Sequence, residues 1–416
     1  MVMENRYDKY KDSGIAWIGE IPEHWEIRKL KNIFLLSTGT TPKEYDKISE
    51  GDNLINWYTP SDILEGCNDL FSSLRKLSER VIYENKISLF PIGTLLYVGI
   101  GASAGKVGYA NENGYSNQQI TGLIPLECYS RFYFYYLSVL KDKIRDNAFF
   151  TTLPIINNVY LGQELLPYPL LSEQQSIATY LDQKCSEIDE LITLQEEMIT
   201  KLQSYKQSVI TEAVTKGLDK NVPLKDSGIE WIGDIPEHWK IVCLKRLSKI
   251  STGNQDTQDS TPDGKYPFFV RSPKVERSNR YTFEGPSILM AGDGVGAGKV
   301  FHLADNKFAC HQRVYCINQF SKINRIFLFY YLSSLFYNII DSANSKSTVD
   351  SVRLPMIAEF PVCIPLDLEQ QSIANYLDQK CSEIDELISI KQQKIEKLKD
   401  YKKSLIFECV TGKRKV

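Results

Sequence analysis

Two stretches of the chain carry a long helical pattern of apolar positions. From Ser172 to Val209, and again from Asp367 to Leu405, apolar residues recur every three or four positions, which predicts two amphipathic helices of about 40 residues, each on the order of 60 Å long. Ser172 and Asp367 are expected to cap the helix starts, while Gly217 and Gly412 should end the helices. In a heptad frame, the expected a and d positions are Ile188, Gln195, Leu202, Val209 with Leu191, Met198, Tyr205, and then Ile384, Lys391, Leu398, Leu405 with Leu387, Lys394, Tyr401.

An amphipathic helix of this length needs a partner for its apolar stripe. The most available partner is its own copy, packed antiparallel through a pseudo-two-fold axis. Gln195 and Lys391 occupy the same a position in the two copies. Two interpretations of this polar pair stay open, since it either fixes the register of the helices or lies near a solvent-exposed end.

The helices are part of a tandem duplication. Residues 12–33 read DSGIAWIGEIPEHWEIRKLKNI and residues 226–247 read DSGIEWIGDIPEHWKIVCLKRL, identical at 15 of 22 positions. Residues 173–192 read EQQSIATYLDQKCSEIDELI and recur at 369–388 with one change. The segments between these ends differ in length and sequence, apart from Ala-Gly-Lys-Val at 104–107 and 297–300 and Phe-Tyr-Tyr-Leu-Ser at 134–138 and 329–333. A duplicated scaffold with two different middle segments indicates one task performed on two targets.

The first repeated segment, residues 12–33 and 226–247, is an apolar and aromatic cassette. Trp17, Trp25, Trp231 and Trp239 are too bulky to remain in water, and the prolines at 22 and 236 prevent a continuous helix. We therefore expect an irregular packing segment, a structural clasp rather than a catalytic site. His24 and His238 are expected to make ordinary packing or capping contacts.

Composition narrows the class of protein. The 416 residues are 43% hydrophobic and 24% charged, with a net charge of −3, as in an ordinary globular protein without a general affinity for nucleic acid. Nine cysteines without a CxxC pair argue against a disulfide framework or a zinc ribbon. The polar N-terminus lacks a signal-peptide core, and the aromatic stretch at 326–340 is too short to span a bilayer and predicts a buried helix. We expect a reduced, cytoplasmic location.

The chain carries few motifs of catalysis. A phosphate-binding loop needs GxxxxGK[ST], but the segments ending in Lys106-Val107 and Lys299-Val300 are one residue short and lack the hydroxyl. We interpret both as tight glycine-rich turns after apolar strands at 94–99 and 287–291. Motifs for zinc proteases, serine hydrolases, calcium loops and amino-methyltransferases are missing. Neither a catalytic residue nor a metal or cofactor site is predicted.

Local features do suggest nucleic acid. Residues 265–280 gather basic side chains among aromatics, as suits contact with phosphate and guanine. Amide-bearing segments follow each Ala-Gly-Lys-Val and could bond adenine, while an arginine there could bond guanine. The first middle segment is slightly acidic and lacks the basic signal. The simpler alternative is that these residues are solvated turns and strand ends. The candidate DNA-binding residues are Thr40, Thr41, Lys43, Lys106, Asn117, Gln118, Gln119, Arg271, Lys274, Arg277, Arg280, Lys299, His311, Gln312 and Arg313.

Together, the two cassettes, the two EQQSIA helices and Ser-Thr-Gly-Thr-Thr-Pro at 37–42 followed by Trp-Tyr-Thr-Pro-Ser-Asp-Ile at 57–63 resemble the specificity subunit of type I restriction–modification systems. The resemblance covers essentially the whole chain. Thr40, Thr41 and Pro42 match the family motif, whereas the second copy departs from it with Ser-Thr-Gly-Asn-Gln-Asp at 251–256.

The resemblance implies an α+β fold, in which two mixed α/β target-recognition domains with small β-sheets are separated by two long antiparallel helices forming a coiled coil. The implied segments are a first recognition domain at 1–172, a first helix at 173–217, a second recognition domain at 218–368, and a second helix with the C-terminal tail at 369–416. Each domain would read half of a gapped, bipartite double-stranded DNA site, and the helices would act as a ruler for the gap.

The resemblance also implies the partners. The subunit would be non-catalytic and would dock two methyltransferase subunits and, in systems that have them, restriction subunits. These partners bind S-adenosylmethionine, ATP and magnesium. The main alternative is a pseudo-symmetric protein–protein scaffold, whose binding would not depend on salt or DNA sequence. A stand-alone enzyme is a third interpretation, which the missing catalytic motifs disfavour.

Overall fold

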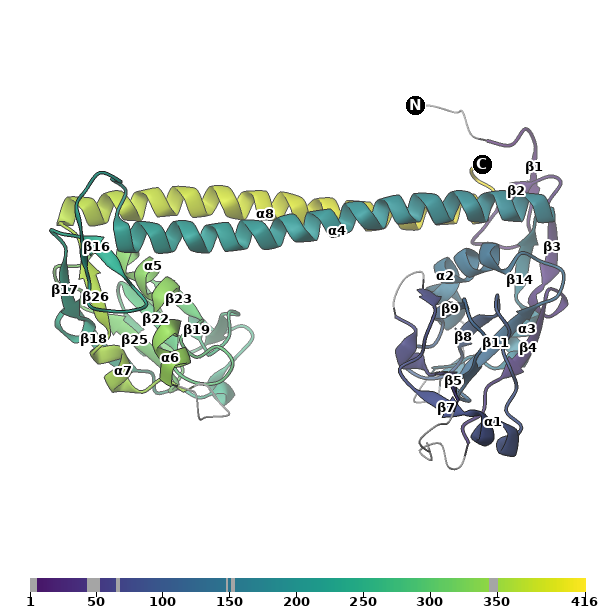
Figure 1. The fold of residues 1–416 in the computed structure, drawn as a ribbon, viewed down its shortest axis with the longest axis horizontal. Coiled ribbons are helices and arrows are strands. Elements are labelled where there is room, and N and C mark those ends of the chain that lie inside the picture. Colours follow the sequence, from purple (N-terminus) through teal and green to yellow (C-terminus); the bar gives the residue numbers. More distant parts are fainter. Residues whose placement is uncertain (1–5, 43–52, 65–67, 147–148, 151–153, 344–350) are drawn as a thin grey trace. The chain divides into compact units, whose positions relative to one another are not determined.

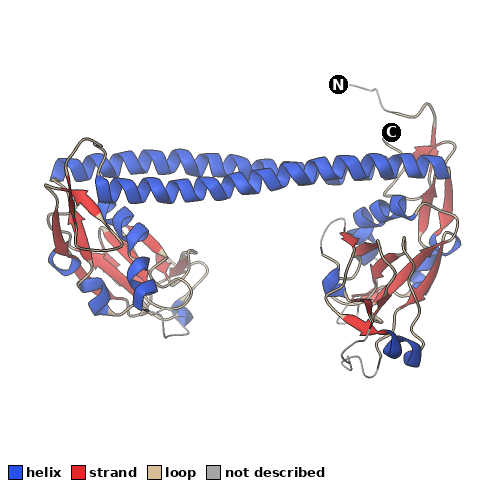
Figure 2. Ribbon diagram, viewed as in Figure 1, coloured by secondary structure: helices blue, strands red, loops and turns tan. Residues whose placement is uncertain are grey.

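A computed structural model describes residues 6–42, 53–64, 68–146, 149–150, 154–343 and 351–416. The chain divides into two compact units, which we call unit 1 (Met1–Leu194 with Lys394–Val416) and unit 2 (Gln195–Gln393). Each unit combines a mixed β-structure, short helices and part of both long helices (Figures 1 and 2). The expected α+β fold with duplicated domains and long helices is confirmed.

The main sheet of unit 1 has the strand order β4-β11-β8-β9-β6. In it, β11 runs antiparallel to both neighbours, and Leu123 lies opposite Leu36 and Leu95. A second sheet has the order β10-β5-β7, with β10 parallel to β5. The elements are β4 (Phe34–Thr38), β5 (Leu54–Tyr58), β6 (Asn68–Leu70), β7 (Lys76–Ser78), α1 (Glu79–Asn85), β8 (Leu95–Val98), β9 (Val107–Ala110), β10 (Tyr115–Ser116), β11 (Ile120–Pro125), α2 (Ser130–Asp146), β12 (Phe149–Phe150), β13 (Pro154–Ile155) and α3 (Asn158–Gln163).

Unit 2 repeats this arrangement although its middle segment has a different sequence. The order β18-β25-β22-β23 matches β4-β11-β8-β9, and Ile317 lies opposite Ile250 and Ile288 in the same register. The second sheet has the order β20-β19-β24-β21, with β24 parallel to β19. The elements are β18 (Lys249–Thr252), β19 (Tyr266–Phe269), β20 (Glu276–Ser278), β21 (Phe283–Glu284), β22 (Ser287–Ala291), β23 (Phe301–Ala304), β24 (Lys307–Cys310), β25 (Val314–Asn318), α5 (Arg325–Leu335), α6 (Tyr337–Ala343) and α7 (Leu354–Ala358).

The two predicted long helices are present as α4 (Leu171–Lys216) and α8 (Asp367–Val410). Gly217 and Gly412 adopt positive φ angles of 76° and 72°, as expected for glycines that follow a helix end. In unit 1, the start of α4 packs on the end of α8, and in unit 2 the end of α4 packs on the start of α8. The helices therefore pair antiparallel within each unit. Each unit contains parts of both helices, so they do not form separate domains.

The heptad prediction is confirmed for the a positions and is wrong for the d positions. The a positions are buried or half-buried, but the d residues Leu191, Met198, Tyr205, Leu387 and Tyr401 are 43–57% exposed. The helix seam instead contains residues four positions after each a residue, Ile192, Ile199, Lys206 and Ala213 in α4 and Ile388, Ile395, Lys402 and Cys409 in α8. Both alternatives are largely apolar, so the pattern alone could not distinguish them. Gln195 is buried in the seam, which excludes a solvent-exposed end for that residue.

The predicted clasp joins the long helices to the sheet of each unit. In unit 1 the cassette and the two residues before it form β1 (Tyr10–Asp12), β2 (Glu20–Pro22) and β3 (Glu26–Lys29), and β3 pairs with β14 (Leu165–Tyr168). Its counterpart in unit 2 forms β15 (Leu224–Asp226), β16 (Asp234–Pro236) and β17 (Lys240–Cys243), which pairs with β26 (Pro361–Ile364). Trp25 and Trp239 are fully buried among residues of the long helices and of α2 or α5. The aromatic stretch at 326–340 lies in this core as α5 and α6, divided at Phe336. Within the described ranges, none of the helices has the length and apolar character needed to cross a membrane.

Candidate nucleic-acid interface

In both units, one loop approaches the backbone of another segment at a shared Ser-Thr-Gly. After β4, Gly39 donates its N–H to the carbonyl of Ile120, and a Cβ on this glycine would lie 2.4 Å from the carbonyl oxygen of Asn117. After β18, a Cβ on Gly253 would lie 1.9 Å from the carbonyl oxygen of Cys310. Only glycine allows these approaches, which explains the shared residue. The two units therefore use equivalent loops although the following residues differ.

In unit 1, this approach brings several predicted site residues together. Thr40 donates its N–H to the carbonyl of Ser116 (2.8 Å), and the exposed Thr41 hydroxyl bonds the amide oxygen of Gln118. Asn117 is buried and donates its side-chain amide to the Gln119 side-chain oxygen (3.0 Å). The exposed polar groups are thus those of Thr40, Thr41 and Gln118, with half-exposed Gln119 beside them. Asn117 supports Gln119 instead of facing solvent.

The equivalent segment of unit 2 contains His311, Gln312 and Arg313. His311 is only 2% exposed, accepts the backbone N–H of Arg313 at Nδ1 (3.0 Å), and places Nε2 3.3 Å from Asp256. The backbone N–H of Thr257 and then the His311 contact lower the pKa of the Asp256 carboxyl. The prediction that the His311 ring contacts DNA is therefore wrong, because the ring is buried. It orients the end of the strand instead. Gln312 and Arg313 are exposed.

The basic residues of 265–280 do not form one continuous free patch. Arg271 pairs with Asp293 (3.1 Å) and Arg280 pairs with Asp259 (3.1 Å). Arg277 donates to the backbone carbonyls of Gly264 and Lys265, whereas the Lys274 side chain is exposed. The partners Asp259 and Asp293 lie 21 and 22 residues from their arginines. These ion pairs therefore cannot be predicted from short-range patterns in the sequence.

The two Ala-Gly-Lys-Val segments form turns after apolar strands, as predicted. Lys106 follows β8 and is half-exposed, and Lys299 follows β22 with its ammonium group 4.1 Å from the ring centre of Tyr337. Lys43 lies outside the described residues. The glycine-rich turn of unit 2 also carries Asp293 and the exposed Val295, neither of which was among the predicted site residues. The sequence feature that marks these two residues is the glycine at every second position, 292, 294, 296 and 298.

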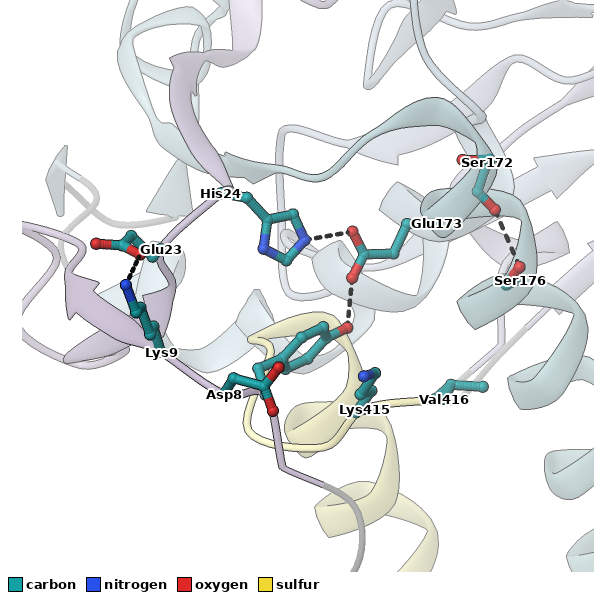
Figure 3. Close-up of a pocket in the computed structure, with 10 residues that line it drawn as sticks. Asp8, Lys9, Glu23, His24, Ser172, Glu173, Ser176, Lys415 and Val416 are labelled. Atoms are coloured by element: carbon teal, nitrogen blue, oxygen red, sulfur yellow. Dashed lines mark hydrogen bonds and ion pairs between the residues drawn. The ribbon is translucent and has the colours of Figure 1, made fainter.

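A separate cavity in unit 1 lies where the cassette meets the start of α4 (Figure 3). There His24 Nε2 lies 2.9 Å from the Glu173 carboxylate, which also accepts the Tyr7 hydroxyl. In unit 2, His238 makes the same 2.9 Å contact with Glu369, whose other oxygen accepts the Trp239 N–H (3.0 Å). These duplicated contacts attach each cassette to a helix start, as the packing interpretation of the histidines predicted. The described part of the chain contains no cluster of three or more potential metal ligands.

The chemistry offered by the two units differs. Beside its Ser-Thr-Gly loop, unit 1 presents hydroxyl and amide groups, which donate and accept hydrogen bonds without net charge, whereas the exposed groups of unit 2 include arginines paired with aspartates. On DNA, amides suit adenine and arginines suit guanine. The same backbone framework therefore carries two different sets of polar side chains.

Comparison with known proteins shows a family that matches most of the chain. The family described as "Type I restriction modification DNA specificity domain" matches residues 22–203 and 236–400. Over 255 residues the chain is 29% identical to the type I restriction enzyme MjaIX specificity subunit of Methanocaldococcus jannaschii, covering 58% of this chain and 55% of that one, so this match spans about half of the relative. It is 24% identical to the MjaVIII specificity subunit of the same organism over 95% of this chain and 94% of the relative.

A solved structure shares the fold. The chain superimposes with a TM-score of 0.74, 14% identity, and coverage of 94% of this chain and 98% of the other, on a structure described as "Structural basis underlying complex assembly and conformational transition of the type I R-M system". The family matches two segments of the chain, and each contains the end of one cassette, one Ser-Thr-Gly loop and most of one long helix. The two matches therefore coincide with the two copies of the duplication. The chain therefore belongs to the family of type I restriction–modification DNA specificity subunits, with two target-recognition domains.

Proposed function

We propose that this chain recognises one bipartite DNA site, with each unit reading one half, and that it is not itself catalytic. The observation that carries the proposal is the pair of equivalent backbone approaches at Gly39 and Gly253, which present different side chains at the same place in the two domains. A duplicated framework with diverged contact residues suits two unlike half-sites. The proposed DNA contacts are Thr40, Thr41, Lys43, Lys106, Gln118 and Gln119 for the first half, and Arg271, Lys274, Arg277, Arg280, Lys299, Gln312 and Arg313 for the second.

The long helices supply a surface for partner subunits in this proposal. In unit 1, Leu191 and Leu194 of α4 and Tyr401 of α8 are exposed. In unit 2, Leu387 and Ile390 of α8 occupy the positions that correspond to Leu191 and Leu194 and are likewise exposed. Exposed apolar side chains that recur in both copies are typical of interaction surfaces. We assign these surfaces to two methyltransferase subunits, one for each repeat.

The chemistry of modification and cleavage would reside in the partners. S-adenosylmethionine would bind the methyltransferase subunits, and ATP and magnesium would bind restriction subunits where these are present. The solved structure that shares the fold is described as concerning complex assembly of a type I system, which agrees with such a complex. A cytoplasmic location, where DNA and these partners are available, belongs to the same proposal.

The test is co-expression with the neighbouring methyltransferase subunit in a host free of adenine methylation, followed by single-molecule mapping of modified adenines. The expected result is a two-part motif with a fixed gap. Exchange of residues 34–172 for those of another specificity subunit should then change one half of the motif only. A stable complex without new methylation, and with binding insensitive to salt and DNA sequence, would instead favour the protein–protein scaffold.

A further inference from the structure

The loop between β22 and β23 of unit 2 is closely packed on the backbone of two arginines. Gly292 donates its N–H to the Arg313 carbonyl (2.8 Å), and a Cβ at this position would lie 2.9 Å from that oxygen. A Cβ on Gly296 would lie 2.4 Å from the carbonyl oxygen of Arg271. A hydrogen bond from the Gly298 N–H to the Ala291 carbonyl (2.9 Å) closes the turn. The loop is therefore held in one place between Arg271 and Arg313.

Asp293 on this loop contacts both arginines. Its Oδ1 lies 3.1 Å from Arg271 Nη1, and its Oδ2 lies 3.7 Å from Arg313 Nε. The Asp293 side chain is 26% exposed, whereas the side chains of Arg271 and Arg313 are 46% and 66% exposed. A carboxylate that occupies one edge of a guanidinium restricts its rotamers and leaves the other N–H donors available. The entropy lost when such an arginine binds a base is correspondingly smaller.

Val295 stands at the tip of the same loop and is 94% exposed. An exposed valine makes no stabilising apolar contact at this position in water, and the rigid turn prevents the side chain from folding back onto the unit. In the major groove, the 5-methyl group of thymine is the apolar feature that such a side chain can contact, whereas arginine bonds the O6 and N7 atoms of guanine. The loop thus places an apolar contact beside two oriented guanine-binding groups.

Unit 1 lacks this set of residues. Gly99 donates to the Gln119 carbonyl (2.8 Å) as Gly292 does to that of Arg313, so the loops correspond. The positions of Asp293, Val295 and Arg313 are held there by Ile100, Ala102 and Gln119. Any recognition by the carboxylate, the valine and the arginines is consequently confined to one half-site.

We infer that Asp293 is a positioning residue that orients Arg271 and Arg313 toward guanine in the second half-site, and that Val295 contacts the methyl group of a neighbouring thymine. This inference rests on the proposed function and adds residues and bases to it. The second half of the motif should therefore contain a guanine adjacent to a thymine, and neither residue should affect the first half.

The first experiment maps adenine methylation by the complex with its methyltransferase for the wild type, Asp293→Asn and Arg313→Lys. Both variants should relax the same guanine position of the second half, with discrimination reduced about tenfold to a hundredfold, because a bidentate contact to guanine supplies discrimination of that order. The control Asp305→Asn removes the carboxylate of another Asp–Arg pair in unit 2, with Arg325 (2.6 Å), and should leave the motif unchanged. Thermal unfolding checks that the variants fold.

The second experiment measures binding to duplexes in which the thymine is replaced by deoxyuridine, which removes only the methyl group. The wild type should bind the substituted duplex more weakly, whereas Val295→Ser should bind both duplexes equally. Three results would overturn the inference. In folded Asp293→Asn, the second half of the motif could stay unchanged, or discrimination could weaken equally at every position of both halves. The Val295→Ser variant could still bind the two duplexes with different affinities. If the wild type yields no bipartite motif at all, the proposed function itself fails.

Discussion

Lys402 of α8 places its Nζ 2.7 Å from both carboxylate oxygens of Asp189 on α4. The duplication repeats the contact with the helices exchanged, since Lys206 of α4 lies 2.7 and 2.6 Å from the carboxylate oxygens of Asp385 on α8. Both lysines occupy seam positions, where their aliphatic stems are covered while the ammonium groups reach the partner helix. Because each unit holds one such pair, the contact specifies the antiparallel register twice.

A double-mutant cycle tests the pair in unit 1. Asp189→Asn and Lys402→Met should show a coupling free energy of about 0.5–1 kcal/mol in denaturant unfolding, because the lysine is largely covered although the aspartate is half-exposed. The same cycle on Glu396 and Lys399, an exposed pair within α8, serves as the control and should give less. A coupling at 189–402 no larger than the control would show that the pair does not specify register.

The two buried cassette tryptophans should differ in their response to Trp→Phe. Trp239 donates its N–H to Glu369 (3.0 Å), whereas the buried N–H of Trp25 finds no hydrogen-bond acceptor within the described ranges. Both substitutions remove the same ring volume, but only Trp239→Phe breaks a bond to a carboxylate. We expect Trp239→Phe to lower the free energy of unfolding by about 1–2 kcal/mol more than Trp25→Phe does. Equal losses in denaturant unfolding would contradict this assignment.

Arg131 of α2 should stabilise unit 1 strongly near neutral pH. Its side chain is only 13% exposed, and the guanidinium bonds Asp69 of β6 and Asp182 of α4 and lies over the ring of Phe134 (4.8 Å). Arg131→Met removes the cation between two partly covered carboxylates, and we expect a loss of about 2 kcal/mol in unfolding free energy. The control Arg80→Met removes an exposed helical pair with Glu84 and should change stability little.

The effect of Arg131→Met should also depend on pH. Burial opposes ionisation of Asp69, but hydrogen bonds from Arg131 and Asn111 outweigh it, so the pKa of this carboxyl lies below its ordinary value. A carboxyl whose pKa is lowered by folding contributes stability above its unfolded pKa and loses it as the pH falls through the folded pKa. The difference between wild type and variant should therefore shrink below about pH 4. A constant difference from pH 7 to pH 3 in thermal unfolding would argue for packing alone.

Matched insertions test whether the helices set the gap in the DNA site, as part of the proposed function. Seven residues added after Gln195 in α4 and after Lys391 in α8 preserve the phase of the seam and lengthen each helix by about 10 Å. The mapped motif should keep both halves and gain about three base pairs of gap, at 3.4 Å per pair. Insertion in one helix alone should destabilise the pairing. An unchanged gap in the double insertion would contradict the ruler.

Much of this architecture can be predicted from local spacing. The long helices, their glycine ends, the burial of Trp25 and the turns around Lys106 and Lys299 follow from periodicity and residue type, because these preferences act within a few residues of the chain. The duplication predicts the two-unit organisation, since a repeated cassette and helix start must pack in the same way twice. Family membership follows from these repeated segments, which carry the motifs.

The details of the candidate interface depended on contacts between distant segments. Whether Leu191 or Ile192 enters the seam is decided by the partner helix, because both are apolar and adjacent. The burial of Asn117 and His311, and their role as supports, arises where a loop about 60–80 residues earlier in the chain reaches their backbone. Asp293 meets Arg271 and Arg313 only because β22, β25 and the loop after β19 converge, a long-range arrangement that periodicity does not encode.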